Sequence, residues 1–129
     1  MIGCLRSHAI SLGVLLAAGL TAVNAARAQT SELKELLDQC AQRDVDACTA
    51  VLQSDDPKIH TEYILANRGL GYAERGDYAA ALHDYDQALL AQPGDPRLYE
   101  NRALIHEAAG NADLAARDNA TARYIRQNR

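Results

Sequence analysis

The apolar residues of this chain recur with the spacing of an α-helix. Early in the chain, for example, apolar side chains at positions i, i+3, i+4 and i+7 share one helix face: Leu33, Leu36, Leu37 and Cys40. Similar faces recur further along, and no segment alternates apolar and polar residues over the length of a strand. The pattern therefore predicts an all-α fold of six helices, paired as three antiparallel hairpins.

Helix boundaries are marked by short polar and glycine-containing segments. Asp-Pro pairs at residues 56–57 and 95–96 each place a capping residue before a proline, which is favoured at the first helical position. Gly76 and Gly110 each end a helix, because glycine readily adopts the left-handed backbone conformation that follows a helix end. These signals predict helices that begin close to residues 57, 78, 96 and 111.

The central and C-terminal segments repeat one another after 34 residues without a gap. The following pairs share that separation: Asn67 and Asn101, Arg68 and Arg102, Leu70 and Leu104, Gly76 and Gly110, Ala81 and Ala115, Asp84 and Asp118, and Ala88 and Ala122. A period of this length is typical of stacked helical hairpins, in which one unit cannot bury its apolar face alone. Such arrays usually present a surface to a partner.

The central unit closely resembles a tetratricopeptide repeat. The resemblance rests on residues 65–78 and then on Ala81, Tyr85, Ala88 and Pro93. It implies a short α-α superhelix, a tetratricopeptide-like solenoid of about three antiparallel helix hairpins, with two repeats at about 62–95 and 96–129. In this register Gly69 and Ala81 are small where two helices cross, and Tyr85 fills the space between hairpins. A shortened, degenerate hairpin over residues 29–56 precedes the two repeats.

One departure from the family pattern recurs in both repeats. Arg68 stands where leucine is common, and Arg102 stands at the equivalent position of the second unit. Asp84 and Asp118 recur at the same spacing from these arginines, so we expect the ion pairs Arg68–Asp84 and Arg102–Asp118. The alternative is that all four charges are merely solvated.

The second unit matches the family pattern less well than the first. A terminal repeat has no following neighbour, so its outer face should be polar. Four residues of the last predicted helix fit that role: Asn119, Thr121, Arg123 and Arg126. We therefore interpret the second unit as the end of the array.

The first 28 residues carry the pattern of a secretory signal peptide. Ala9–Val23 is an apolar stretch, and Ala-Arg-Ala at residues 26–28 has the small-x-small form of a cleavage site. The alternative is a retained membrane anchor, but this stretch is shorter than the roughly 20 residues that span a bilayer. We therefore predict a signal peptide over residues 1–28, a periplasmic or secreted location, and no membrane contact after cleavage.

Two cysteines would remain after cleavage. Cys40 and Cys48 flank a predicted turn, and their spacing is similar to that of secreted Sel1-like repeat proteins, whose cysteine pairs bridge the two helices of a hairpin. An exported protein meets an oxidising compartment, and the number of cysteines left is even. The resemblance thus implies a Cys40–Cys48 disulfide, and the alternative is two buried free thiols on facing helices.

Composition and motifs argue against catalysis and against several kinds of partner. From Gln29 onward the chain has eleven basic and seventeen acidic residues, a balance that disfavours nucleic acid and anionic membranes as partners. It has no glycine-rich phosphate loop, no nucleophile elbow and no Cys-x-x-Cys pair. His60, His83 and His106 fall on different predicted elements, so they do not form a metal site. We predict no enzyme activity, no cofactor and no metal.

The family resemblance also implies where a protein or peptide partner binds. In tetratricopeptide arrays the first helices of the hairpins line a concave groove that holds a peptide. Here that groove would carry eight residues: Tyr63, Asn67, Leu70, Glu74, Arg97, Glu100, Asn101 and Leu104. Asn67 and Arg97 match positions of the family's carboxylate-clamp branch, whereas Glu100 has the wrong sign for a clamp. The alternative for Asn67 and Asn101 is ordinary polarity at a helix contact.

The sequence therefore predicts a non-enzymatic protein-interaction module. The alternative is a structural self-assembly unit that forms head-to-tail homo-oligomers. That alternative is motivated by charge, because residues 29–62 are acidic and the C-terminal unit is basic.

Overall fold

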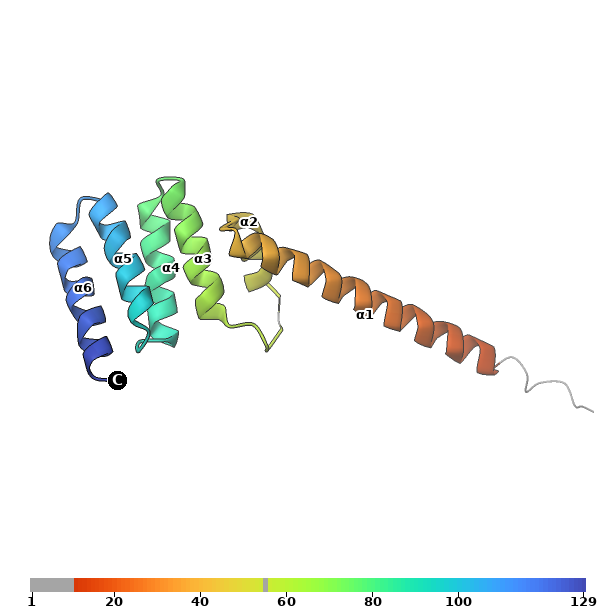
Figure 1. Cartoon of the computed structure of the whole chain (residues 1–129). Helices are drawn as coiled ribbons and strands as arrows, with labels where there is room; N and C mark the ends of the chain where they lie inside the picture. The colour runs from red at the N-terminus through yellow and green to blue at the C-terminus, as the bar shows by residue number, and fades with distance from the viewer. Residues whose placement is uncertain (1–10, 55) are drawn as a thin grey trace, which may run out of the picture. The chain divides into compact units, whose positions relative to one another are not determined.

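The computed structural model describes residues 11–54 and 56–129 (Figure 1). In these residues it contains six helices and no strand: α1 (Ser11–Ala41), α2 (Val45–Leu52), α3 (Thr61–Glu74), α4 (Tyr78–Ala91), α5 (Pro96–Ala108) and α6 (Ala112–Gln127). The all-α prediction is confirmed for this part of the chain.

The chain divides into two compact units, and the boundary falls between Glu35 and Leu36. Helix α1 is 31 residues long and contributes to both units. The predicted cleavage site at residues 26–28 lies inside α1 and is exposed, while residues 1–10 of the predicted leader lie outside the described residues. None of the described helices is long and apolar enough to cross a membrane.

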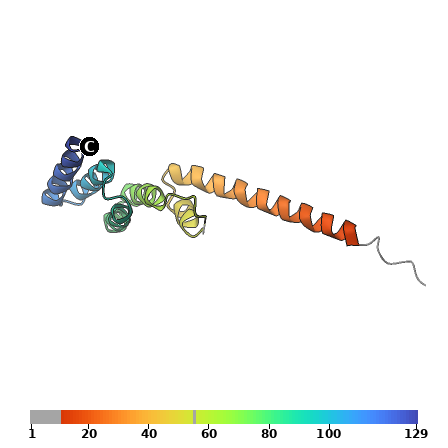
Figure 2. The same cartoon turned by 90° about the horizontal axis from the view of Figure 1, so that it is seen from below.

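In the second unit, each helix from α2 to α6 packs against the next one in the chain. Figures 1 and 2 show α3 with α4 and α5 with α6 as two antiparallel hairpins, and contacts between α4 and α5 join them. Helix α2 packs on α3 in the same way. This order of contacts is the one expected for stacked helical hairpins.

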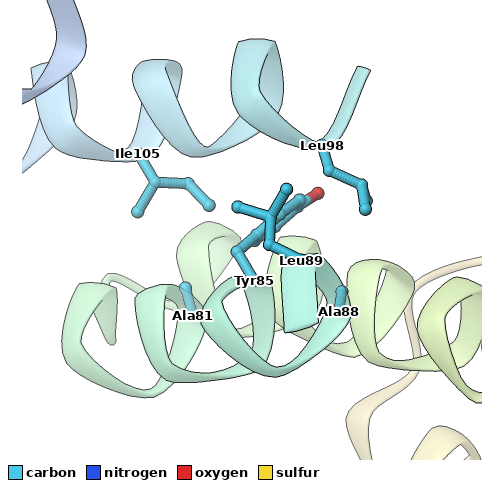
Figure 3. Close-up of a cluster of buried hydrophobic side chains, with 6 residues drawn as sticks. All are labelled: Ala81, Tyr85, Ala88, Leu89, Leu98 and Ile105. Carbon is cyan, nitrogen blue, oxygen red and sulfur yellow. The ribbon is translucent and has the colours of Figure 1, made fainter. Parts of the chain in front are cut away.

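The two hairpins meet at a core of buried side chains, shown in Figure 3. Helix α4 contributes Ala81, Tyr85, Ala88 and Leu89, and α5 contributes Leu98 and Ile105. Tyr85 is fully buried, and Gly69 of α3 faces its ring, where an added Cβ would come within 3.0 Å. The roles predicted for Gly69, Ala81 and Tyr85 are confirmed, because a larger residue at the crossing would force the helices apart.

Helix α3 begins later than the sequence pattern predicts. The Asp-Pro pair at 56–57 does not open it, since the helix starts at Thr61 with His60 as its N-cap. Asp56 instead closes a short turn, in which its carboxylate accepts from the Lys58 amide at 2.9 Å and its carbonyl accepts from the Ile59 amide at 3.1 Å. The equivalent pair before α5 behaves as predicted, because Asp95 caps that helix and Pro96 is its first residue.

The first hairpin is formed by the C-terminal end of α1 and by α2. Cys40 and Cys48 join them, with their sulfur atoms 2.09 Å apart and their Cα atoms 4.6 Å apart. Arg43 turns the chain between the helices with a φ of 68°. The carbonyl oxygen of Arg43 lies so close to Gly71 of α3 that an added Cβ there would overlap it. Glycine at position 71 therefore lets the first hairpin approach the second.

Candidate partner-binding groove

The eight residues predicted to line the groove lie on two helices. Tyr63, Asn67, Leu70 and Glu74 belong to α3, and Arg97, Glu100, Asn101 and Leu104 belong to α5. Tyr63 and Leu104 are large apolar side chains that are 61% and 62% exposed. When a partner covers exposed apolar side chains of this size, their removal from water contributes favourable binding free energy.

The two repeated asparagines are half-buried, so each amide is partly withdrawn from water. Asn101 lies close to the phenol of Tyr85, whose hydroxyl is buried without a hydrogen bond of good geometry to any described residue. Burial raises the pKa of Tyr85 to about 12, and Asn101 opposes part of this rise. Asn101 therefore lies over the hairpin core as well as on the surface of α5.

Arg97, the predicted clamp cation, is bound to its own helix cap. Its Nε and Nη2 atoms donate to the two carboxylate oxygens of Asp95 at 3.1 and 2.8 Å. These hydrogen bonds lower the pKa of Asp95 and raise that of Arg97, and Tyr63 adds a smaller electrostatic contribution to the pKa of Arg97. A partner carboxylate that bound Arg97 would have to compete with Asp95 for its guanidinium.

The two predicted groove carboxylates are also paired. Glu74 forms an ion pair with Arg43 from the turn between α1 and α2. Glu100 accepts from Arg126 of α6 at 2.7 Å. Both carboxylates are therefore paired within the chain. The predicted groove residues that remain available to a partner are mainly apolar side chains and amides.

Leu70 departs from its predicted role. It is half-buried and packs against the core cluster between α4 and α5, so it is a packing residue and not a free groove residue. Leu104 occupies the equivalent position one repeat later and is exposed. The difference arises because Leu70 is covered by the hairpin that follows it, whereas no described hairpin follows Leu104.

The recurring arginines make the predicted ion pairs and also make contacts that the sequence did not reveal. Arg68 donates to both carboxylate oxygens of Asp84 at 2.8 Å, and Arg102 does the same to Asp118 at 2.7 Å. Arg68 also donates to the Thr49 hydroxyl of α2 at 3.2 Å. Arg102 donates in the same way to Asp86 of α4 at 2.6 Å. Each arginine thus links its own hairpin to the preceding one.

An apolar pocket that was not predicted from the sequence lies at the start of α3. Its volume is about 330 Å³, and it is lined by Leu37, Lys58, Ile59, His60, Glu62, Tyr63 and Ile64. Tyr63 belongs both to this pocket and to the predicted groove. The signal available in the sequence was Ile59, an apolar residue in the polar segment before α3, but the late start of that helix hid its role.

The histidines have the separate positions that were predicted. His60 precedes α3, while His83 and His106 lie on α4 and α5. Within residues 11–54 and 56–129, no group of three His, Cys, Asp or Glu side chains could hold a metal ion.

Comparison with known families bears on the central unit. Residues 62–95 match the tetratricopeptide repeat model. These are the residues of the first predicted repeat, in which α3 and α4 form the hairpin. The chain thus contains a tetratricopeptide repeat, a unit that serves in protein-interaction scaffolds.

Two curated relatives are also similar to this chain. Both are named Photosystem I assembly protein Ycf3, one from Synechococcus elongatus and one from another Synechococcus strain. Each is 39% identical over 75 residues, a match that covers 53% of this chain and 43% of the relative. The chain therefore spans less than half the length of these relatives. No solved structure matches the chain significantly.

The comparison corrects the predicted location. The relatives are named for the assembly of photosystem I, a photosynthetic complex, and not for work in the periplasm or outside the cell. The prediction of a periplasmic or secreted protein is therefore wrong. An oxidising compartment therefore no longer supports the disulfide, and the Cys40–Cys48 bridge rests on the geometry of the first hairpin.

Proposed function

We propose that this chain is a non-enzymatic interaction module that holds an extended segment of a partner protein along α3 and α5. The observation that carries the proposal is that α3 and α5 each present one exposed apolar side chain and one half-buried amide. These are Tyr63 and Asn67 on α3, and Leu104 and Asn101 on α5. Apolar contacts supply affinity through desolvation, and amides can hydrogen-bond a partner's backbone whatever its side chains are.

The pairing of the groove charges suits such a partner. Arg97, Glu74 and Glu100 are each held by an opposite charge of the same chain. A partner therefore does not have to bring a carboxylate or a cation to satisfy them. This favours recognition of an extended backbone with apolar side chains over recognition of a charged terminus.

The names of the relatives suggest the class of task. Both are assembly proteins of a multisubunit complex. We propose that this chain likewise assists assembly, by holding a segment of a subunit before it reaches its final partner. This role is carried over as a class of activity, because the match covers only 43% of each relative.

Head-to-tail self-assembly has less support. The basic C-terminal end would have to offer free cations to an acidic end of another copy. Arg126 is paired with Glu100, and Arg129 donates to the Gly94 carbonyl at 3.1 Å. These contacts commit two of the basic residues of that end within the chain.

Site-specific photo-crosslinking in the native host tests the groove. The photoreactive residue p-benzoylphenylalanine would replace Tyr63 or Leu104 in the groove, or Leu90 or Leu114 as exposed apolar controls. We expect a partner, identified by mass spectrometry, to be crosslinked from Tyr63 and Leu104 and not from the controls. Crosslinks from Leu90 and Leu114 alone would place the binding surface elsewhere and overturn the proposal.

The amides are tested with the partner that crosslinking identifies. Asn67→Ala combined with Asn101→Ala removes two backbone contacts and should weaken binding on the order of tenfold, with helicity unchanged. The matched control is His83→Ala with Gln87→Ala, since both residues are exposed on α4. Equal effects of the two double variants would show that the asparagines do not contact the partner.

The removal of residues 1–28 remains a prediction. The intact mass of protein purified from the native host would test it. A chain that begins at Gln29 is expected, and an unprocessed Met1 would exclude the cleavage.

A further inference from the structure

An apolar pocket of about 330 Å³ lies at the start of α3. Leu37 from the end of α1, Ile59 from the segment before α3, and Ile64 of α3 contribute its apolar lining. Tyr63 forms part of the same lining and is also one of the predicted groove residues of α3. The pocket is thus continuous with the proposed binding surface.

The charged residues around this pocket differ in whether they already have a partner within the chain. Glu62 lies 3.2 Å from His60 Nδ1, a contact that is an ion pair only when the histidine is protonated, and Arg97 of α5 is held by Asp95. Lys58 is exposed on the rim, and its ammonium has no carboxylate partner among the residues that the structure describes. Among the described residues that line the pocket, Lys58 is therefore a cation that an incoming carboxylate can bind without breaking a described ion pair.

We propose that this pocket takes an apolar side chain of the partner segment, with a carboxylate on the adjacent residue that binds Lys58. The inference rests on the proposed function and adds the chemistry of the anchor. The volume is near the lower end of the range for small-ligand sites, about 300–1,000 Å³, which suits one or two side chains better than a large cofactor. Apolar burial supplies most of the affinity, and the Lys58 contact supplies a preference for acidic over basic neighbours.

The test uses nuclear magnetic resonance with the ¹⁵N-labelled full chain and four short acetylated peptides. The peptides have the form Ser-Gly-X-Z-Gly-Ser, where X is Leu or Ser and Z is Asp or Lys. We expect the Leu-Asp peptide to shift the amide signals of Ile59, Tyr63 and Ile64. The Leu-Lys peptide should bind up to about fivefold more weakly, since exposed ion pairs are worth little. Neither Ser peptide should bind.

Two substitutions separate the two contacts. Lys58→Gln should abolish the preference for Asp over Lys while leaving Leu-dependent binding, and the matched control Arg123→Gln should change neither. Tyr63→Ser should remove Leu-dependent binding, and because Tyr63 is mostly exposed the helicity should be retained. An unchanged preference in Lys58→Gln would refute the role of Lys58.

Other outcomes would overturn the proposal in other ways. If the Leu peptides shift no signals at millimolar concentration, the pocket is not an anchor for such a segment. If the same signals shift with protein concentration in the absence of peptide, a second copy of the chain occupies the pocket. Photo-crosslinking from Leu104 can still succeed in either case, so failure of the anchor and failure of the groove are distinguishable.

Discussion

Arg68 of α3 donates two hydrogen bonds of 2.8 Å to the carboxylate of Asp84 on α4. The Asp84 side chain is only 2% exposed, so this arginine satisfies a charge that water hardly reaches. Its guanidinium also lies over the ring of Tyr72, 5.8 Å from the centroid. The two-pronged geometry requires a guanidinium at this position, since lysine could not make both bonds.

Removing one member of this pair should destabilise the fold strongly. Arg68→Ala leaves Asp84 buried without its partner, a loss that typically costs about 3–5 kcal/mol. Urea denaturation followed by circular dichroism should show a much lower midpoint. Arg68→Met with Asp84→Leu replaces both charges by apolar groups and should recover most of the loss. A double variant no more stable than Arg68→Ala would contradict the buried-charge explanation.

Gly71 provides a test of how closely the first hairpin packs on α3. Gly71→Ala would overlap the carbonyl oxygen of Arg43, so the turn must shift, and overpacking of this kind typically costs about 1–3 kcal/mol. Gly94→Ala is the matched control, because no described atom lies within 4 Å of an added Cβ there. Thermal melts should separate the two variants. If Gly71→Ala has the same melting temperature as the wild type, the close packing of the Arg43 turn on α3 is wrong.

The Cys40–Cys48 bridge should stabilise the first hairpin. Closing so short a loop contributes about 2.5 kcal/mol on the chain-entropy model. Peptide mapping without reductant is expected to recover the two cysteines joined, and Cys48→Ser should lower the melting temperature. Reductant should have a similar effect on the wild type and none on Cys48→Ser. Two freely alkylated thiols in protein purified without reductant would rule the bridge out.

The buried phenol of Tyr85 predicts a loss of stability in alkaline solution. Burial raises its pKa to about 12, against about 10 in an unfolded chain. The folded state therefore holds this proton more tightly, and the resulting stability is complete below pH 10 and is lost as pH rises from 10 towards 12.

Tyr85→Phe should remove that part of the alkaline dependence. At neutral pH the variant should be as stable as the wild type or more stable, because it loses a buried hydroxyl without a well-formed hydrogen bond to a described residue. Urea denaturation at pH 7 and pH 11 would measure both effects. Parallel losses in the two proteins would show that other groups, and not Tyr85, cause the alkaline sensitivity.

Local regularities of the sequence were enough to predict much of this fold. The 34-residue period predicted the paired hairpins, and the recurring Arg and Asp residues predicted both buried ion pairs. Gly69 and Ala81 were identifiable because a helix crossing admits only small side chains, whatever its surroundings. The location was not predictable in this way, because an apolar leader pattern reports composition and not destination.

The tertiary structure decided which of the predicted groove residues are free. Leu70 packs against the core formed with the following hairpin, and Arg97 is bound by Asp95. The 34-residue period of the sequence gives no sign of either contact. The pocket beside Tyr63 and the contact of Gly71 with Arg43 join segments that are distant along the chain. The physical reason is that helical periodicity states which face of a helix is apolar, whereas the neighbour that covers that face, and the charge that meets its rim, depend on how the hairpins stack.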